Sequence, residues 1–405
     1  MNNKTNNLIF VQEADKILFS NLKNFCTEAI FLQDSLGRIL AEDIKADRDL
    51  PPFNRVTHDG IAIRFNAMNN GIFSFTIKGA QSAGGAQIEI NDLHECIEIM
   101  TGASLPESVD TVVPYEDIDI ENRQARIHAN ATIVQNQCIH FQGKDKKQNE
   151  ILAEANRLIT PPVITIASAV GKAKLLVKKL PKMLIISTGN ELVDVSETPA
   201  PSQVRRSNNY MIEAALKQYA FKTDMQHLPD DEQLIEEKLR QYLNEYDILL
   251  LSGGVSAGKF DYVPAVLEKL QVEKLFHRIK QRPGKPFWFG KHAKGAVVFA
   301  FPGNPVASFM CLHRYFLPWI YQCYGIDTTA RYAVLEEDFT FTASLQYFLQ
   351  VKIHYNDKGE TTAKPIEGNG SGDFVNLLQT DAFMELPLEK NEFKKGETYR
   401  IWTFI

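Results

Sequence analysis

The chain has 405 residues, more than one hydrophobic core usually serves, so we expect about two to four compact domains. Its hydrophobic fraction of 44% and charged fraction of 23% are those of an ordinary folded protein and exclude a mainly disordered or fibrous chain. The net charge of -6, with no long run of Lys or Arg, argues against nucleic acid as a partner.

The chain carries no sign of a targeting or membrane segment. Its first residues are polar, and no later stretch is long and apolar enough to cross a bilayer, so we expect a cytoplasmic protein without a membrane partner. The five cysteines are widely spaced and include no C-x-x-C pair. This pattern fits buried free thiols better than a disulfide framework or a zinc site.

The N-terminal half alternates between helical and β patterns. Residues 11–40 begin with apolar residues at helical spacing, whereas prolines and alternating runs predict an inserted, mainly β domain over residues 51–146. Helical spacing then returns. We therefore expect residues 147–180 to pack with residues 1–50 as one helical linking domain.

From residue 181 onward, short buried runs alternate with helical stretches. The runs cover residues 183–186, 247–251 and 296–301. This pattern predicts a doubly wound α/β domain over residues 181–326, with a parallel sheet covered on both faces. Alternation and turn sequences then predict a small C-terminal β domain over residues 327–405.

Each of the three buried runs leads into a glycine-containing loop. The loops cover residues 187–192, 252–258 and 302–305. Because parallel strands present their carboxyl ends at one edge, we expect the loops to form one site. Gly253, Gly254 and Gly303 would let the backbone approach an oxyanion, and Ser252 and Ser256 add hydroxyl donors. Taken singly, each loop is equally well an ordinary strand-to-helix turn.

A loop rich in proline and glycine carries two cations, Arg282 and Lys285, three residues apart. A stiff loop loses little entropy when both charges converge on an anion. The alternative is a solvated basic turn, which is the usual reading of an isolated charge cluster. The aromatic run at residues 287–289 favours an ordered, partly buried setting instead.

Several acidic residues along the chain are candidates for holding a magnesium ion, because hard cations prefer carboxylate oxygen. The candidates are Asp59, Asp145, Glu191, Asp247 and Asp261. No spacing among them dictates a metal, and most surface acids are simply solvated. The histidines also lack ligand spacing.

One motif indicates a different class of enzyme. Residues 254–258 match the G-x-S-x-G pattern of a hydrolase nucleophile, which would make Ser256 reactive. In such enzymes the serine follows its strand directly, whereas residues 252–255 intervene here. We regard the match as a coincidence of a glycine-rich loop.

Taken together and in order, seven motifs resemble those of the molybdopterin molybdenumtransferase family, which includes MoeA and the E domain of gephyrin. The motifs are Thr57 to Ala62, Met100 to Ala103 with Leu105 to Glu107, Ser187 to Val193, Ser207 with Asn208, Ser252 to Gly258 with Asp261 and Tyr262, Arg282 to Pro286, and Pro302 to Val306. The resemblance spans nearly the whole chain, and the ordered set is specific although no single motif is.

The resemblance implies a four-domain homodimer whose active cleft draws on both subunits, with an α/β domain like the molybdopterin adenylyltransferase fold. It implies adenylyl-molybdopterin and molybdate as substrates, magnesium as cofactor, and release of AMP as molybdenum enters the dithiolene. It also suggests the molybdopterin adenylyltransferase as a partner.

Site residues follow from the resemblance by position. Catalytic roles would belong to Asp59, Asp145, Glu191, Asp261 and Lys285. Asp59, Glu191 and Asp261 would hold magnesium. Substrate contacts would come from Thr101, Ser207, Asn208, Ser252, Gly253, Gly254, Ser256, Arg282, Lys285, Pro302, Gly303 and Pro305.

The sequence departs from the family pattern at four positions. The family commonly has Met, Tyr, Asp and Ser where His58, Ile61, Arg206 and Ala307 stand. Arg206 reverses a charge beside the expected cleft, which would either weaken magnesium binding or add a contact to an anionic substrate. Ala307 removes a hydroxyl that the neighbouring Ser308 could replace.

Three alternatives remain open at this point. Arg206 and Ala307 favour a binding or scaffold protein of the same fold with little turnover. A related enzyme acting on tungstate or another nucleotide-pterin is equally compatible, since molybdate and tungstate are tetrahedral dianions of similar size. A serine hydrolase using Ser256 is the third.

Overall fold

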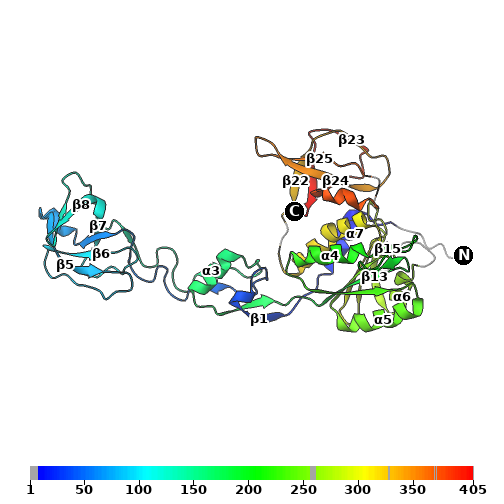
Figure 1. Cartoon of the computed structure of the whole chain (residues 1–405), viewed down its shortest axis with the longest axis horizontal. Coiled ribbons are helices and arrows are strands. Elements are labelled where there is room, and N and C mark those ends of the chain that lie inside the picture. Colours follow the sequence, from blue (N-terminus) through cyan, green and yellow to red (C-terminus); the bar gives the residue numbers. More distant parts are fainter. Residues whose placement is uncertain (1–7, 256–260, 327–328, 369, 371, 405) are drawn as a thin grey trace. The chain divides into compact units, whose positions relative to one another are not determined.

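The computed structural model describes residues 8–255, 261–326, 329–368, 370 and 372–404. Contacts divide the chain into two compact units (Figure 1). Unit 1 comprises Met1–Glu28, Gly37–Ile39 and Val177–Ile405, and unit 2 comprises Ala29–Leu36 and Leu40–Leu176. The predicted domain boundaries stay predictions, since each unit joins several predicted segments.

Unit 2 contains the expected β-rich fold. Its main sheet has the strand order β7-β4-β6-β5-β9-β8. The strands are β4 (Gly60–Ile63), β5 (Ser74–Gln81), β6 (Glu95–Ile99), β7 (Thr111–Pro114), β8 (Ile118–Glu121) and β9 (Gln124–Ile127). Alternate residues of β4 enter different apolar clusters, Ala62 on one side and Ile61 with Ile63 on the other. Both faces of the sheet are therefore covered.

Short elements complete this part of the chain. They are η1 (Leu32–Asp34), β2 (Ile44–Lys45), β3 (Arg55–Val56), α2 (Asn66–Asn69), η2 (Tyr115–Asp117), β10 (Ile139–His140), β11 (Ile151–Ala153) and α3 (Pro161–Ala169). Strand β1 (Thr27–Phe31) pairs with β12 (Lys174–Lys178). Residues 174–178 lie in the segment for which the sequence predicts helical spacing, but they form this strand, because buried Leu175 and Val177 alternate with exposed or partly exposed neighbours.

The α/β part of unit 1 is built on a six-stranded sheet of order β16-β13-β17-β21-β20-β18. The strands are β13 (Met183–Thr188), β16 (Thr223–Leu228), β17 (Ile248–Ser252), β18 (Val272–His277), β20 (Trp288–His292) and β21 (Val297–Phe301). Strands β16, β13, β17 and β21 run parallel to one another, whereas β20 and β18 are joined to them at one edge by antiparallel pairing. The parallel core confirms the predicted α/β domain.

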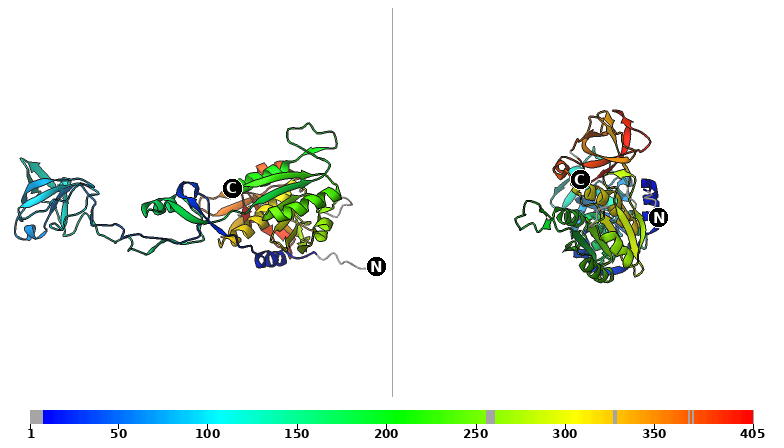
Figure 2. Two further views of the ribbon diagram at one scale, coloured as in Figure 1. Left: turned by 90° about the horizontal axis from the view of Figure 1, so that it is seen from below. Right: turned by 90° about the vertical axis from the view of Figure 1, so that its right-hand side faces the viewer.

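Helices cover both faces of this sheet, as Figures 1 and 2 show. One face packs against α5 (Glu232–Glu245) and α6 (Val263–Lys269). The other packs against α4 (Ser207–Lys217) and a long helical segment. That segment consists of α7 (Pro305–Cys311), the π-helical η3 (Leu312–Phe316) and α8 (Leu317–Cys323). Since both faces are buried, the central strands β13, β17 and β21 are almost continuous apolar runs.

The N-terminal helix α1 (Val11–Ser20) also packs into the second face of the sheet. Its residues Val11, Ala14 and Leu18 are fully buried there. We had placed this helix with residues 147–180. The apolar stripe of a short helix shows that it must be buried, but it does not identify the surface that buries it.

The C-terminal part of unit 1 is a second six-stranded sheet of order β19-β24-β25-β22-β28-β26. The strands are β19 (Gln281–Arg282), β22 (Arg331–Leu335), β24 (Gln346–Tyr355), β25 (Thr361–Pro365), β26 (Ala382–Leu386) and β28 (Thr398–Thr403). Smaller elements are β14 (Leu192–Val193) with β15 (Val204–Arg205), β23 (Phe339–Thr340) with β27 (Glu392–Phe393), and η4 (Phe374–Leu378). The predicted C-terminal β domain is confirmed. No described helix has the length and apolar character of a membrane span.

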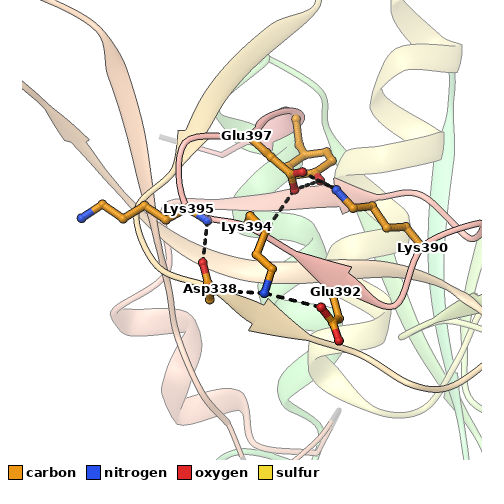
Figure 3. A network of polar contacts seen from close by, with 7 residues as sticks. Asp338, Lys390, Glu392, Lys394, Lys395 and Glu397 are labelled. Atoms are coloured by element: carbon orange, nitrogen blue, oxygen red, sulfur yellow. Dashed lines mark hydrogen bonds and ion pairs between the residues drawn. The ribbon is translucent and has the colours of Figure 1, made fainter.

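The turn between β27 and β28 carries a network of charges, shown in Figure 3. Lys394 lies 3.3 Å from Asp338 and 3.4 Å from Glu392, and Lys390 pairs with Glu397. Lysine and tyrosine donors lower the pKa of Glu397 to about 2. These side chains are well exposed, so the network fixes the shape of the turn more than it stabilises the domain.

A buried arginine links three parts of unit 1. Arg314 of η3 is only 2% exposed and donates to both carboxylate oxygens of Asp15 on α1, at 2.8 and 2.7 Å. It also lies 3.4 Å from Glu385 on β26. Burial alone would lower the pKa of Arg314, but the two carboxylates raise it above its ordinary value. The cation therefore requires the helix α1 and the C-terminal sheet to be in place together.

Glu385→Gln tests this link, because Glu385 also accepts from Gln346 at 2.6 Å and from the Trp402 indole at 2.7 Å. Removing its charge leaves Arg314 with half of its compensation in a buried setting. We expect the free energy of unfolding to fall by about 3 kcal/mol. Urea titration followed by circular dichroism measures this, with the exposed Glu389→Gln as control. Equal midpoints for the two variants would contradict the link.

Candidate functional site

The three glycine-containing loops meet at one edge of the α/β sheet. Strands β13, β17 and β21 are in parallel register, with Ser187 opposite Ser252 and Ser252 opposite Phe301. Beyond the strands, the backbone N–H of Gly253 donates to the Phe301 carbonyl at 3.2 Å. The sequence predicted this convergence from the strand pattern alone.

Asn208 at the start of α4 joins two of the loops. Its amide group donates to the Ser252 hydroxyl at 2.9 Å and to the Gly303 carbonyl at 2.7 Å. Helix α4 begins at Ser207, so the predicted pair of Ser207 and Asn208 stands directly against the loop ends. Four of the predicted substrate contacts therefore come together.

Two glycines allow this close approach. Gly253 and Gly254 have φ angles of +95° and +66°, a region that other residues rarely adopt. A Cβ atom on Gly254 would lie 2.6 Å from the Thr188 hydroxyl, and one on Gly253 would lie 3.0 Å from the Thr188 carbonyl. Only glycine fits at these positions while the loops keep this spacing.

Two adjoining cavities open at this edge. The larger, of about 680 Å³, and the smaller, of about 380 Å³, share Thr188, Glu191, Gly253, Gly303 and Asn304 as lining residues. The larger also contacts Ser207, Asn208, Ser252, Pro305, and Gly372 with Phe374 from the C-terminal domain. The smaller also contacts Gly189, Asp230, Gly254, Asp261, Pro286 and Pro302.

The larger cavity is lined by buried polar groups whose atoms lack hydrogen-bond partners. These atoms are Thr188 Oγ1, Arg206 Nε, Asn208 Oδ1 and Asn209 Oδ1. Most buried polar atoms in folded proteins are paired, and an unpaired one costs free energy. Four such atoms around one cavity indicate that a polar ligand belongs there.

Arg206, the charge that departs from the family pattern, lines the larger cavity and forms an ion pair with Asp194. The pair is partly buried, with side chains 20% and 31% exposed. Asp194 accordingly has a lowered pKa, chiefly because the Ser196 N–H and hydroxyl donate to it and secondly because of Arg206. The sequence did not predict this partner, since the two residues are joined only by the pairing of β14 with β15.

A second group of polar residues behind the cavity was also missed. Buried Asn209 donates to the Ser187 hydroxyl at 3.3 Å, and Ser187 contacts His227 Nδ1 at 3.1 Å. Burial, followed by the nearby Arg206, lowers the pKa of His227. These residues support the floor of the site. Ser187 begins one of the motifs, but no motif marks Asn209 or His227, because strand and helix residues of this kind are common in any core.

Asp230 is another acid at the site that the sequence reading missed. It follows β16 and exchanges hydrogen bonds with Asn190, at 3.1 Å and 3.0 Å. It lines the smaller cavity with Glu191 and Asp261. Its position after a parallel strand was the available signal, because β16 ends at the same edge as β13.

The two cations of the proline loop lie in different surroundings. Lys285 is exposed and directly precedes Pro286, which lines the smaller cavity. Arg282 instead lines a separate cavity of about 50 Å³ against the C-terminal domain, with its guanidinium 5.9 Å from the Phe341 ring centre. The loop therefore brings only the neighbourhood of Lys285 to the site, and Arg282 contacts neither of the two larger cavities.

Two further expectations concern Ser308 and Ser256. Ser308 does not replace the hydroxyl missing at Ala307, because Ser308 is fully buried and its hydroxyl donates to the Pro302 carbonyl. Ser256 lies outside the described residues. Strand β17 ends at Ser252, so residues 253–255 separate this serine from the strand, unlike a nucleophile elbow.

Asp59, Thr101 and Asp145 belong to unit 2. The Asp59 carboxylate accepts from the Thr101 N–H at 2.6 Å, and this bond is the main cause of its lowered pKa. Asp145 contacts His140 at 2.8 Å, and His140 in turn lies 3.3 Å from Arg55. Both carboxylates are exposed. Asp59 and Thr101 thus form one polar pair.

The acids of the site do not form a closed metal cage. No group of three or more His, Cys, Asp or Glu able to hold a metal occurs among the described residues. Glu191, Asp230 and Asp261 nevertheless line one cavity. Hard oxygen donors of this kind suit magnesium, which keeps several waters and needs only one or two carboxylates beside a substrate phosphate.

Comparisons with known proteins agree with this architecture. Residues 9–171 match the MoeA N-terminal region (domain I and II), residues 184–322 a probable molybdopterin binding domain, and residues 332–404 the MoeA C-terminal region (domain IV). The molybdopterin biosynthesis MoeA protein from Pyrococcus horikoshii OT3 is similar in structure, with a TM-score of 0.82, 27% identity and coverage of 98% of this chain and 99% of that one. A molybdenum cofactor biosynthesis protein from Pyrococcus furiosus shares the fold, with a TM-score of 0.60, 22% identity and coverage of 98% and 99%.

Curated relatives are similar over their full length. The chain is 37% identical to the molybdopterin molybdenumtransferase of Synechocystis over 98% of its own residues and 100% of the relative. It is 31% identical to that of Staphylococcus epidermidis, over 96% and 94%. The chain therefore belongs to the molybdopterin molybdenumtransferase family and is an enzyme of molybdenum cofactor biosynthesis.

Proposed function

We propose that this enzyme inserts molybdenum from molybdate into adenylyl-molybdopterin and releases AMP as it does so. The observation that carries the proposal is the cavity of about 680 Å³, where four buried polar atoms have no partner and three glycine loops meet. Such a site suits a large polar anion, because backbone N–H groups and neutral side-chain donors can form hydrogen bonds to the anion from several sides.

The roles of the residues follow from their positions. Asn208, Ser252 and the loops around Gly253 and Gly303 would hold the pterin and its phosphate in the larger cavity. Lys285 would extend from its exposed position toward molybdate at the smaller cavity. Charge stabilisation and positioning would then supply most of the rate enhancement, as is general for transfer at phosphate.

The carboxylates of the smaller cavity suit a magnesium ion, as their oxygen donors indicate. Glu191 and Asp261 would hold it, with Asp230 beside them. When bound, magnesium would neutralise charge on the phosphoanhydride and help its cleavage. Together these carboxylates give the smaller cavity a negatively charged lining.

We further propose that the enzyme acts as a homodimer whose cleft combines the edge of the α/β sheet with residues of unit 2. Unit 2 would contribute Asp59, Thr101 and Asp145 to this cleft, and Asp59 would be a third magnesium ligand. The cytoplasmic location and a contact with the molybdopterin adenylyltransferase stay predictions. A scaffold without turnover is not favoured, since the curated relatives are named as transferases and Arg206 is neutralised by Asp194.

Lys285→Ala should lower molybdate-dependent AMP release by about 100-fold or more, as expected when a preorganised charge is removed from the transition state. The fold should be unaffected, because the Lys285 side chain is exposed. AMP release by purified protein with adenylyl-molybdopterin and molybdate measures the effect. Lys274→Ala, at an exposed position on β18, is the control. Normal turnover in Lys285→Ala would remove the cation loop from the mechanism.

Asp59→Asn should also impair turnover, because the lowered pKa of Asp59 keeps a negative charge where the proposal needs one. Mixed dimers carrying Asp59→Asn on one subunit and Lys285→Ala on the other should recover one intact cleft. About half of the normal activity per mixed dimer is then expected. Differently tagged subunits allow the mixed dimers to be isolated. If such dimers stay as inactive as either parent, the shared cleft is wrong.

Arg206→Gln tests whether the unusual charge is used. Loss of a charged contact to an anionic substrate should raise KM about tenfold with kcat nearly unchanged. Asp194→Asn, which frees the guanidinium, should not raise KM. Arg240→Gln removes a comparable ion pair on α5 and is the control. Arg206→Asp should reduce activity further; a gain in activity would instead mean that the arginine hinders the reaction.

A further inference from the structure

A separate cavity of about 300 Å³ lies where the segment from η3 to α8 meets the C-terminal sheet. It shares no lining residue with the two cavities at the loop edge of the α/β sheet. The side chains that matter for its chemistry are Tyr219, His313, Tyr321, Arg331, Arg400 and Trp402. None of them has a role in the proposed transfer reaction.

His313 gives the first indication that this cavity takes a ligand. The residue is only 6% exposed, and its buried Nε2 atom has no hydrogen-bond partner. It stands on the π-helical segment Leu312–Phe316, which interrupts the otherwise α-helical run. Such π turns are frequent at functional sites, because they redirect side chains at a cost in helix stability. A buried donor or acceptor without a partner is a further cost that a ligand would relieve.

Two arginines give the second indication. Arg331 donates to the Thr403 hydroxyl at 3.0 Å, and the Arg400 Nε atom is buried without a partner. Neither forms an ion pair with a carboxylate in the described part of the chain, whereas the neighbouring Arg314 occupies both Asp15 and Glu385. Burial and then the charge of Arg314 lower the pKa of Arg400. The cavity therefore has an excess of positive charge that an anion would balance.

Aromatic side chains supply the rest of the wall. Tyr219 and Tyr321 are packed edge to face, with ring centres 5.6 Å apart. The Arg400 guanidinium lies 4.0 Å from the Trp402 ring. Flat aromatic surfaces favour a planar ligand, and a volume of about 300 Å³ is at the small end of ligand sites.

We propose that this cavity binds a small aromatic carboxylate. Its carboxylate would accept from Arg331 and Arg400, and its single ring would lie among the tyrosine and tryptophan side chains. The site is distinct from the one that holds the pterin, so its occupancy is measured as binding and does not depend on the proposed transferase activity.

The test is calorimetric titration of the full-length protein with benzoate, with benzamide as the uncharged probe of the same shape. We expect saturable benzoate binding, with one site per chain, and at least about tenfold weaker binding of benzamide, because the charge-assisted hydrogen bonds are lost. Benzamide binding as tight as benzoate, or no saturable benzoate binding at millimolar concentration, would overturn the proposal.

Variants locate the binding. Arg400→Gln and Arg331→Gln should each weaken benzoate binding about tenfold, and the exposed Arg240→Gln should not. In protein labelled at histidine, benzoate should shift the ring resonance of His313, identified as the one missing from His313→Phe. This measurement needs no arginine variant, so it still tests the site if the arginine variants fail to fold. An unshifted His313 resonance at saturating benzoate would place the ligand elsewhere and refute the site.

Discussion

The functional site depends on the close approach of three loops that follow strands in parallel register. The pairing of β13, β17 and β21 places Gly253 against the backbone of Phe301 and against Thr188. Any side chain at Gly253 or Gly254 would push the loops apart and open the edge of the sheet. Positive φ angles at both glycines reinforce the requirement. The shape of the candidate site is therefore a consequence of backbone packing before any charged side chain is considered.

A buried charge plays the corresponding role between the α/β sheet and the C-terminal sheet. Burying the Arg314 cation without both carboxylates would destabilise the fold, and these carboxylates come from α1 and β26. The C-terminal domain is thereby fixed relative to the sheet edge, which explains how Gly372 and Phe374 reach the larger cavity. Arg400 lies near the same charges but forms no ion pair of its own among the described residues, and the cavity beside it is lined by Arg331 and Arg400 without a carboxylate.

Sequence patterns predicted the parts of this fold that depend on periodicity. The apolar runs gave the parallel strands, and the glycine loops then followed at one edge, where the structure has them. The packing of α1 was not predictable in this way, because its stripe would fit any large apolar surface. Arg282 shows that sequence spacing does not predict where a charged side chain lies. Although Arg282 and Lys285 are only three residues apart, Arg282 lies against the Phe341 ring, whereas Lys285 is next to Pro286, which lines the smaller cavity. The ion pair between Arg206 and Asp194 depends on the register of β14 and β15, and strands of two residues are too short to be predicted from a sequence pattern.

The Arg206–Asp194 pair bears on how an unusual charge can be tolerated beside the acidic residues of the candidate site. An unpaired arginine near Glu191 would attract the carboxylates there, whereas a paired arginine is largely neutral to its surroundings. Its Nε atom is buried and has no hydrogen-bond partner, although the residue lines the larger cavity. The ion pair thus separates two properties of the guanidinium. Asp194 balances its net charge, while the Nε donor is left unpaired.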